Sequence, residues 1–151
     1  MSSAIIAAIR QGLVQNTAVT TLVPESRITS AYRQDTGTLP AIVLTVQTDE
    51  AVSPSFPRTD CLRRMAMNIE CIATSLKAAR ELGEIVRRAM HGAAGTASST
   101  TIHEIRENGI TSTYDVGAEG TETGIHIAVV SVDAYYRAQS VAPTTITTPG
   151  G

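Results

Sequence analysis

The amino-acid sequence predicts a single α+β domain in which a mixed, mainly antiparallel sheet packs against two helices. Three observations support this fold class. Residues 62–73 alternate between apolar and polar side chains, and residues 75–92 then change to a helical period. Predicted strands follow one another directly, with the helices separated from them rather than alternating with them. The 151 residues fit one domain with one hydrophobic core.

The strand and the helix within residues 62–92 each have one apolar side. On the strand the apolar positions are Met65, Met67, Ile69, Cys71 and Ala73. On the helix they are Leu76, Ala79, Leu82, Ile85, Val86, Ala89 and Met90. We therefore expect Met67, Ile69 and Cys71 to face Leu82, Val86 and Met90 in the core.

The elements before this unit are shorter. A helix capped by Ser3 is expected to run to about Gln15, and a second turn or helical piece is expected over residues 17–22. Residues 27–33 read as a first strand. A second strand is expected over residues 41–47, opened by Pro40.

The elements after the helix begin with a small-residue linker over residues 92–101. Two short strands, 102–107 and 110–116, are expected on either side of Asn108-Gly109, which is a strong two-residue hairpin signal. A polar turn and a last strand over residues 125–136 follow. The middle of that strand is apolar on both faces, as in a central strand covered on both sides.

The chain end lacks any hydrophobic period. Residues 139–151 are rich in Thr, Pro and Gly, so we expect a domain over residues 1–138 and a flexible tail over residues 139–151. The apolar run near the N-terminus is too short for a signal peptide or a membrane span. The net charge of −2 provides no broad basic field for binding nucleic acid.

The residue types needed for catalysis or metal binding do not occur in suitable patterns. His91, His103 and His126 have no paired ligand spacing, and neither cysteine accompanies one of them. If the strand is extended throughout, Cys61 and Cys71 lie ~33 Å apart, which is beyond disulfide reach. The sequence therefore predicts no catalytic residue, no metal site and no cofactor.

A long Pro-rich segment over residues 49–60 joins two strands that should pair antiparallel. It is longer than an ordinary hairpin loop of ~2–5 residues, and loops of this length are commonly functional. It contains the only Phe of the chain, and the candidate interface residues are Pro54, Phe56, Pro57 and Arg58. We expect this segment to contact a partner protein rather than to form a free loop.

The layout resembles the tail-completion, or tail-terminator, proteins of long-tailed bacteriophages. Two N-terminal helical segments (AIIAAIRQGLVQNTAVTTLVPESRI) precede a strand that begins at a proline (LPAIVLTV). A strand merging into a helix follows (MNIECIATSLKAARELGEIVRRAM), and the pattern closes with VVSVDAYYRA. The resemblance covers residues 4–137 and rests on this order of elements rather than on an invariant motif.

The resemblance implies a structural virion protein of the phage neck, assembled in the host cytoplasm. Such a protein forms a hexameric ring that caps the tail tube, stops its polymerisation and joins it to the head-completion complex. Its partners would be its own copies, the tail tube protein and the head-completion protein, with no membrane, and genome DNA would only pass through the ring. Two alternatives stay open: another head–tail connector or tube-related protein, and a small soluble ligand-binding or enzymatic α+β domain.

Overall fold

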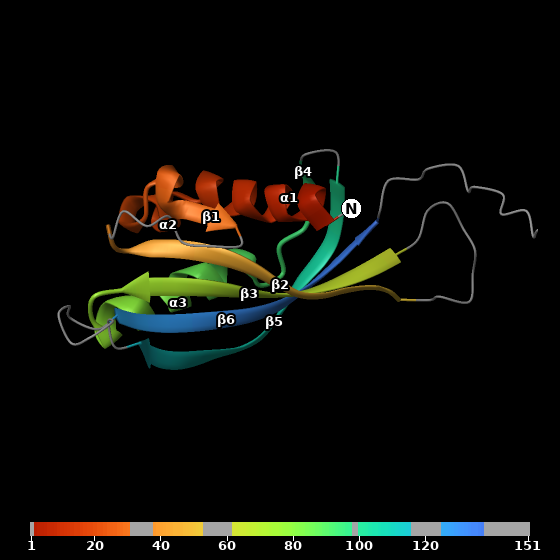
Figure 1. Ribbon diagram of the computed structural model, residues 1–151. Coiled ribbons are helices and arrows are strands. Elements are labelled where there is room, and N and C mark those ends of the chain that lie inside the picture. The colour runs from red at the N-terminus through yellow and green to blue at the C-terminus, as the bar shows by residue number, and fades with distance from the viewer. Residues whose placement is uncertain (1, 31–37, 53–61, 98–99, 116–124, 138–151) are drawn as a thin grey trace, which may run out of the picture.

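One curled sheet organises the fold in the computed structural model, which describes residues 2–30, 38–52, 62–97, 100–115 and 125–137 (Figure 1). The described helices are α1 (Ser2–Gln15), α2 (Thr17–Leu22) and α3 (Leu76–Met90), with a 3₁₀ turn η1 (Glu25–Arg27). The described strands are β1 (Ile28–Ser30), β2 (Ala41–Ala51), β3 (Leu62–Ala73), β4 (Gly95–Ala97), β5 (Thr100–Asp115) and β6 (Ile125–Arg137).

The strand order across the sheet is β1-β2-β3-β6-β5-β4. Strand β1 runs parallel to β2, and every other described pair is antiparallel. Strand β6 lies between β3 and β5, so the prediction that the last strand is central is confirmed. The α+β class with a mixed, mainly antiparallel sheet is confirmed as well.

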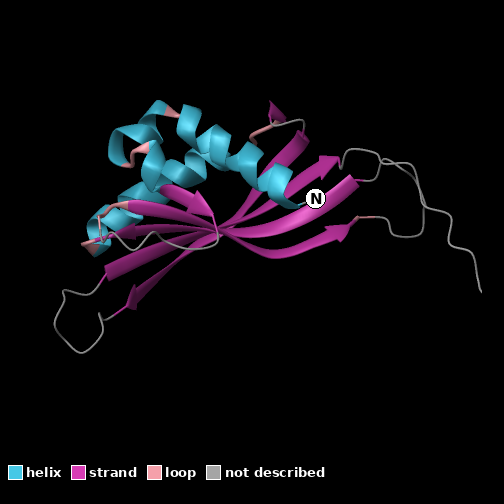
Figure 2. Cartoon of the chain, turned by 45° about the horizontal axis from the view of Figure 1, so that its top comes forward, coloured by secondary structure: helices cyan, strands magenta, loops and turns pink. Residues whose placement is uncertain are grey.

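The helices lie together on the concave side of the sheet (Figure 2). Helix α3 packs on β3 and β6, whereas α1 contacts β1 near one edge of the sheet and β4 near the other. The sheet therefore curls around the helices, and α1 spans the gap between its two edges. None of the described helices is both long and apolar enough to cross a membrane.

The core joins the strand and helix faces that the sequence pattern selects. Met67, Ile69 and Cys71 are buried in one cluster with Leu82, Val86 and Met90, which confirms the expected buried faces. A Cβ atom added at Gly83 of α3 would lie 3.1 Å from the Cβ atom of Ala128 on β6. Glycine at this position thus permits the close approach of α3 to the middle of the sheet.

Hydrogen-bonding side chains cap two of the helices at their N-termini. Ser75 Oγ accepts a hydrogen bond from the Ala78 amide at 3.1 Å, so α3 begins where the strand period ends. Asn16 Oδ1 accepts one from the Ala18 amide at 3.0 Å and separates α2 from α1. The expected helical piece over residues 17–22 is confirmed as α2.

The predicted hairpin at Asn108-Gly109 is wrong. Strand β5 runs unbroken from Thr100 to Asp115 along β6, and the register shifts between Glu107 and Ile110. The two residues form a bulge in one strand, with Gly109 at a φ of +115°. Asn-Gly favours bulges as well as turns because both use backbone conformations that other residues rarely adopt.

Other strand boundaries also differ from the prediction. Strand β2 continues to Ala51, so the first residues of the predicted loop over 49–60 belong to the sheet. The predicted linker over residues 92–101 contains β4 and the start of β5. The first strand begins at Ile28, and residues 31–33 of its predicted extent lie outside the described residues.

Helices cover only one face of β6, whereas the apolar run in its middle predicts cover on both faces. Val130 and Val132 point into the core and are buried, while Val129 and Ser131 on the other face are partly exposed. Ser131 Oγ donates a hydrogen bond to Asn68 Oδ1 of β3 across this outer face at 3.0 Å. The outer face of the sheet is thus semi-polar and lacks a helical layer in the described part of the chain.

Candidate functional site

The titratable residues singled out in the sequence do not converge in the described part of the chain. His91 caps the C-terminus of α3, and His103 lies on β5. His126 on β6 contacts the ring of Tyr114, with centroids 4.7 Å apart and the ring planes tilted by 46°. Within the described ranges, no three His, Cys, Asp or Glu side chains are grouped to hold a metal ion. Ser131 and Asp133 share β6 with His126, as the sequence spacing indicates.

Cys71 is a core residue rather than a reactive thiol. Its side chain is fully buried on β3, and burial raises its pKa to about 12. Because the thiolate is the nucleophilic form, this thiol is unreactive in the folded protein at neutral pH. Cys61 lies outside the described residues.

The candidate interface residues Pro54, Phe56, Pro57 and Arg58 also lie outside the described residues. Both ends of their segment are described. Strand β2 ends at Ala51 and β3 begins at Leu62, and the Val52 amide donates to the Leu62 carbonyl oxygen at 3.0 Å. The segment therefore starts and finishes at the closed end of an antiparallel strand pair, which fixes its two attachment points.

A network of three side chains stabilises this end of the sheet. The Tyr136 hydroxyl donates to both carboxylate oxygens of Asp49 at 2.9 Å. Arg63 Nε donates to Asp49 Oδ1 at 3.1 Å, and another nitrogen of the same guanidinium donates to the Asp49 carbonyl oxygen at 3.1 Å. These residues come from β6, β2 and β3, so the network ties three strands together near the end of β2 and the start of β3.

Burial makes this network sensitive to alkaline pH. Only 1% of Tyr136 is exposed, and burial followed by the hydrogen bond to Asp49 raises its pKa to about 12. The hydrogen bond that Arg63 itself donates to Asp49 raises the pKa of Arg63. Because the folded-state pKa of Tyr136 exceeds its ordinary value of about 10, its stabilising contribution is complete below that pH. It is lost as the pH rises from about 10 toward 12.

The sequence pattern did not reveal the network. Asp49 falls in the predicted loop, and Tyr136 is 87 positions away along the chain. The sequence offers one usable signal. Tyr136 is an even number of positions from the buried Val130 and Val132, so it lies on the same side of β6.

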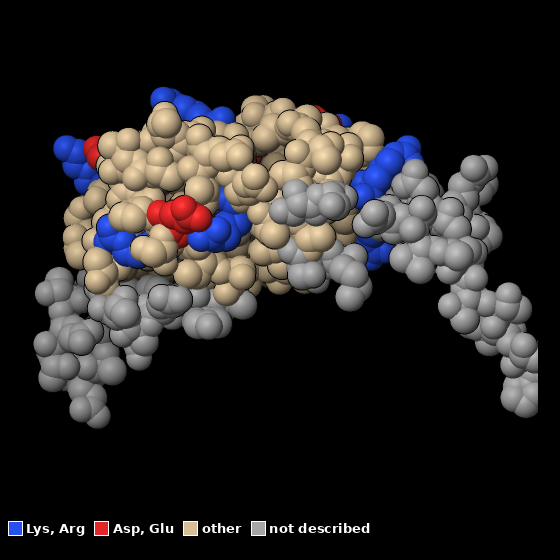
Figure 3. Space-filling model, turned by 90° about the horizontal axis from the view of Figure 1, so that it is seen from above, with Lys and Arg blue, Asp and Glu red and all other residues tan. Residues whose placement is uncertain are grey.

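The outer surface of α1 and α2 is almost free of charge. Between residues 2 and 24 the only charged side chain is Arg10, whose Nε donates to the Ile28 carbonyl oxygen at 2.8 Å. Figure 3 shows a mostly uncharged surface when the molecule is seen from the side of these helices. The exposed side chains are Ala7, Gln11, Gln15, Thr17, Ala18, Thr21 and Leu22. Depletion of charge is typical of the centre of protein interfaces.

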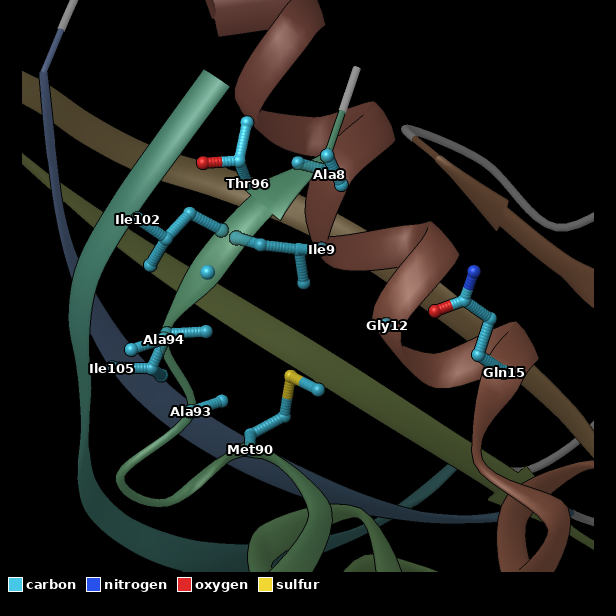
Figure 4. Close-up of a pocket in the computed structure, with 12 residues that line it drawn as sticks. Ala8, Ile9, Gly12, Gln15, Met90, Ala93, Ala94, Thr96, Ile102 and Ile105 are labelled. Carbon is cyan, nitrogen blue, oxygen red and sulfur yellow. The ribbon is translucent and has the colours of Figure 1, made fainter. Parts of the chain in front are cut away.

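A cavity of about 160 Å³ lies between α1, the end of α3 and the start of β5 (Figure 4). Its lining is mainly apolar and includes Ile9, Met90, Ile102 and Ile105, with Gln15 and Thr96 as polar members. None of the lining side chains is titratable. The cavity therefore suits a small apolar group and offers no acid, base or nucleophile for chemistry.

Comparison with known proteins identifies the family. The family model described as "Tail completion protein gp17" matches residues 7–137, which is most of the chain. Among curated protein sequences, none matches the chain. A similar solved structure is a chain of the virion of a native gene transfer agent particle, with 15% sequence identity and a TM-score of 0.65. That match covers 91% of this chain and 97% of the other, and it shows a shared fold.

The family match and the fold agree with the resemblance noted in the sequence. The matched residues 7–137 extend from the first helix to the last strand and include the strand–helix unit formed by β3 and α3. The chain therefore belongs to the tail completion protein gp17 family and is a structural protein of a phage tail.

Proposed function

We propose that this protein forms a hexameric ring that caps the phage tail tube, ends its polymerisation and joins it to the head-completion complex. The observation that carries the proposal is the family match over residues 7–137. The partners are further copies of the chain, the tail tube protein and the head-completion protein. Genome DNA passes through the lumen of the ring without being bound as a substrate.

The physical basis of the proposal is heterologous contact. A tail tube grows because each layer offers a surface that the next layer fits, and a ring closes contacts of this kind on themselves. A ring subunit needs lateral surfaces as well as surfaces toward the tube and the head. The almost uncharged surface of α1 and α2 is available for these contacts. The semi-polar outer face of the sheet is available as well.

The role is mechanical, so we propose that no residue of the chain is catalytic and that no cofactor is needed. The protein would be assembled in the host cytoplasm and located in the neck of the virion, away from any membrane. Another head–tail connector or a tube-related protein is the alternative within the same class. A ligand-binding or enzymatic role has no specific support from the apolar cavity beside α1.

Removal of the protein during particle assembly tests this function. Without a terminator, tubes lack the cap that ends their growth, so we expect tails of uncontrolled length that are not joined to heads. Electron microscopy of particles made with the gene deleted measures tail length and head attachment, and expression of the intact chain should restore both. Tails of normal length joined to heads in the deletion strain would contradict the proposal.

We also propose that residues 139–151 form a flexible tail outside the domain of residues 1–138.

We propose in addition that Pro54, Phe56, Pro57 and Arg58 form an intersubunit or tube-facing contact. Phe56→Ser should leave the monomer folded, with an unchanged circular dichroism spectrum, but should weaken ring formation or tube capping. The reason is that the substitution removes the aromatic side chain that would anchor the contact. The two neighbouring prolines would stiffen the segment, so that little entropy is lost when it docks. Normal rings with tails of normal length in this variant would disprove the contact, and loss of the folded monomer would assign Phe56 to the core.

A further inference from the structure

Strand β5 has a long open edge. The short strand β4 pairs with only Thr100–Ile102 of β5, and the next contact on that side is made by Gly92 and Ala93. From Arg106 to Asp115, no other described residue forms a backbone ladder with this side of β5. Figures 1 and 2 both show this half of β5 at the border of the sheet.

The hydrogen bonds of Ile105 show which amides of β5 point outward. Its amide donates to the Ala93 carbonyl oxygen at 3.0 Å, and its carbonyl oxygen accepts from the Gly92 amide at 2.8 Å. Both groups of Ile105 therefore point away from β6. In an antiparallel pair this orientation alternates from one residue to the next.

The register with β6 shows how the alternation of outward and inward amides continues beyond the bulge at Asn108-Gly109. Ile105 lies opposite Ala134, and the residues opposite Val130, Ala128 and His126 are Ile110, Ser112 and Tyr114. Because all four partners occupy even positions of β6, the amides of Ile110, Ser112 and Tyr114 point outward as that of Ile105 does. The amides of Thr111 and Thr113 point toward β6 instead.

The open edge of β5 lacks the features that keep sheet edges apart. Residues 110–114 (ITSTY) contain no charge and no proline, and β-branched and aromatic side chains predominate. Of these five residues Ile110 is partly buried and the other four are exposed, including Tyr114, which is 55% exposed. Monomeric proteins usually protect such an edge with charges, prolines or a covering segment.

Among the described residues, a second edge without a complete partner strand lies on the other side of the same sheet. Strand β1 pairs with only Ile42–Leu44 of β2, so the remainder of β2, from Thr45 to Ala51, has no described partner on that side. Its two acidic residues are already paired within the chain, Asp49 with Arg63 and Glu50 with Arg64. This edge can therefore accept a neutral strand without leaving an unpaired carboxylate.

The strand directions allow the open edge of β5 in one copy to pair with the open edge of β2 in another. Strands β2, β3, β6 and β5 are successively antiparallel, so β5 runs opposite to β2. When two copies are placed side by side in the same orientation, β5 of one copy is antiparallel to β2 of the next. The two open stretches lie toward opposite ends of the strands, so neighbouring copies would be staggered, as strands in closed sheets are.

We propose that residues 110–114 of β5 pair with the second half of β2 in a neighbouring copy of this chain, so that the sheet continues from subunit to subunit. This inference rests on the proposed ring and specifies one of its lateral contacts. The contact is heterologous, because each copy offers β5 on one side and β2 on the other, and such a contact can close into a ring.

Proline substitutions at adjacent positions of β5 test the contact. Ser112→Pro removes an outward amide and leaves the ladder with β6 intact, so we expect a folded monomer that no longer forms rings. Ser112→Thr keeps the amide and should form rings normally. Thr111→Pro removes an amide that points toward β6, and it should lower the stability of the monomer itself. Rings formed by Ser112→Pro would overturn the proposal.

Hydrogen exchange of the unmodified chain gives an independent test. In the ring, the amides of Ile110, Ser112 and Tyr114 should exchange at least tenfold more slowly than in the monomer, while those of Thr111 and Thr113 are protected in both states. Unchanged exchange at the three outward amides would overturn the edge pairing and leave the proposed ring standing. Absence of rings from the unmodified chain, in solution and on tail tubes, would overturn both.

Discussion

Replacing Ile69 by alanine is expected to lower the free energy of unfolding by about 2–5 kcal/mol. Ile69 is fully buried at the middle of β3, between Leu44 of β2 and Val130 of β6, and it belongs to the cluster that α3 covers. Three elements would lose contacts at once, and a close-packed interior relaxes only partly around the resulting cavity. Chemical denaturation followed by circular dichroism measures the loss.

Asn68 provides the matched control for this substitution. It is the preceding residue on β3, but it points to the outer face, where its Oδ1 accepts a hydrogen bond from Ser131. Asn68→Ala removes one partly exposed hydrogen bond and should cost about 1 kcal/mol. If Asn68→Ala proved severe and Ile69→Ala neutral, the assignment of the two faces of β3 would be reversed.

Replacing Asp49 by alanine is expected to lower the free energy of unfolding by about 2–3 kcal/mol. The change leaves the buried Tyr136 hydroxyl without its acceptor and removes the carboxylate partner of Arg63, whose side chain is 28% exposed. Hydrogen bonds to charged groups contribute more than neutral ones, and an orphaned buried hydroxyl adds its own cost.

The next residue on β2 again supplies a control. Glu50 forms an ion pair with Arg64 at 3.0 Å, but its side chain is 58% exposed, so Glu50→Ala should cost at most about 1 kcal/mol. Denaturation of the two variants under identical conditions compares the two carboxylates. Equal small losses would show that the network of Tyr136, Asp49 and Arg63 does not stabilise this end of the sheet.

The elements with a strong hydrophobic period were predictable from the sequence. Strand β3 and helix α3 show a change of period at Ser75, where the cap of α3 lies, so their boundaries and buried faces follow from local pattern. Local pattern did not distinguish a turn from a bulge at Asn108-Gly109, because glycine suits both. Pairing of β5 with β6 along its whole length determines the bulge, and that pairing is a long-range property.

The parts of the candidate site that escaped prediction also depend on long-range contacts. Asp49 follows a run of polar residues and reads as the start of a loop, but its bonds to Arg63 and Tyr136 bring it into the sheet. Among the described residues, the open edges of β2 and β5 depend on how few of their positions pair with β1 and β4, which only the strand pairing reveals. The interface role of Phe56 stays a prediction.

The position of the protein in an assembled particle tests the central proposal most directly. A cryo-electron microscopy reconstruction of the neck region should show six copies in one ring, between the last layer of the tail tube and the head-completion complex. Density for the chain at any other place in the particle, or a subunit arrangement that does not close around the tube, would contradict the proposed function.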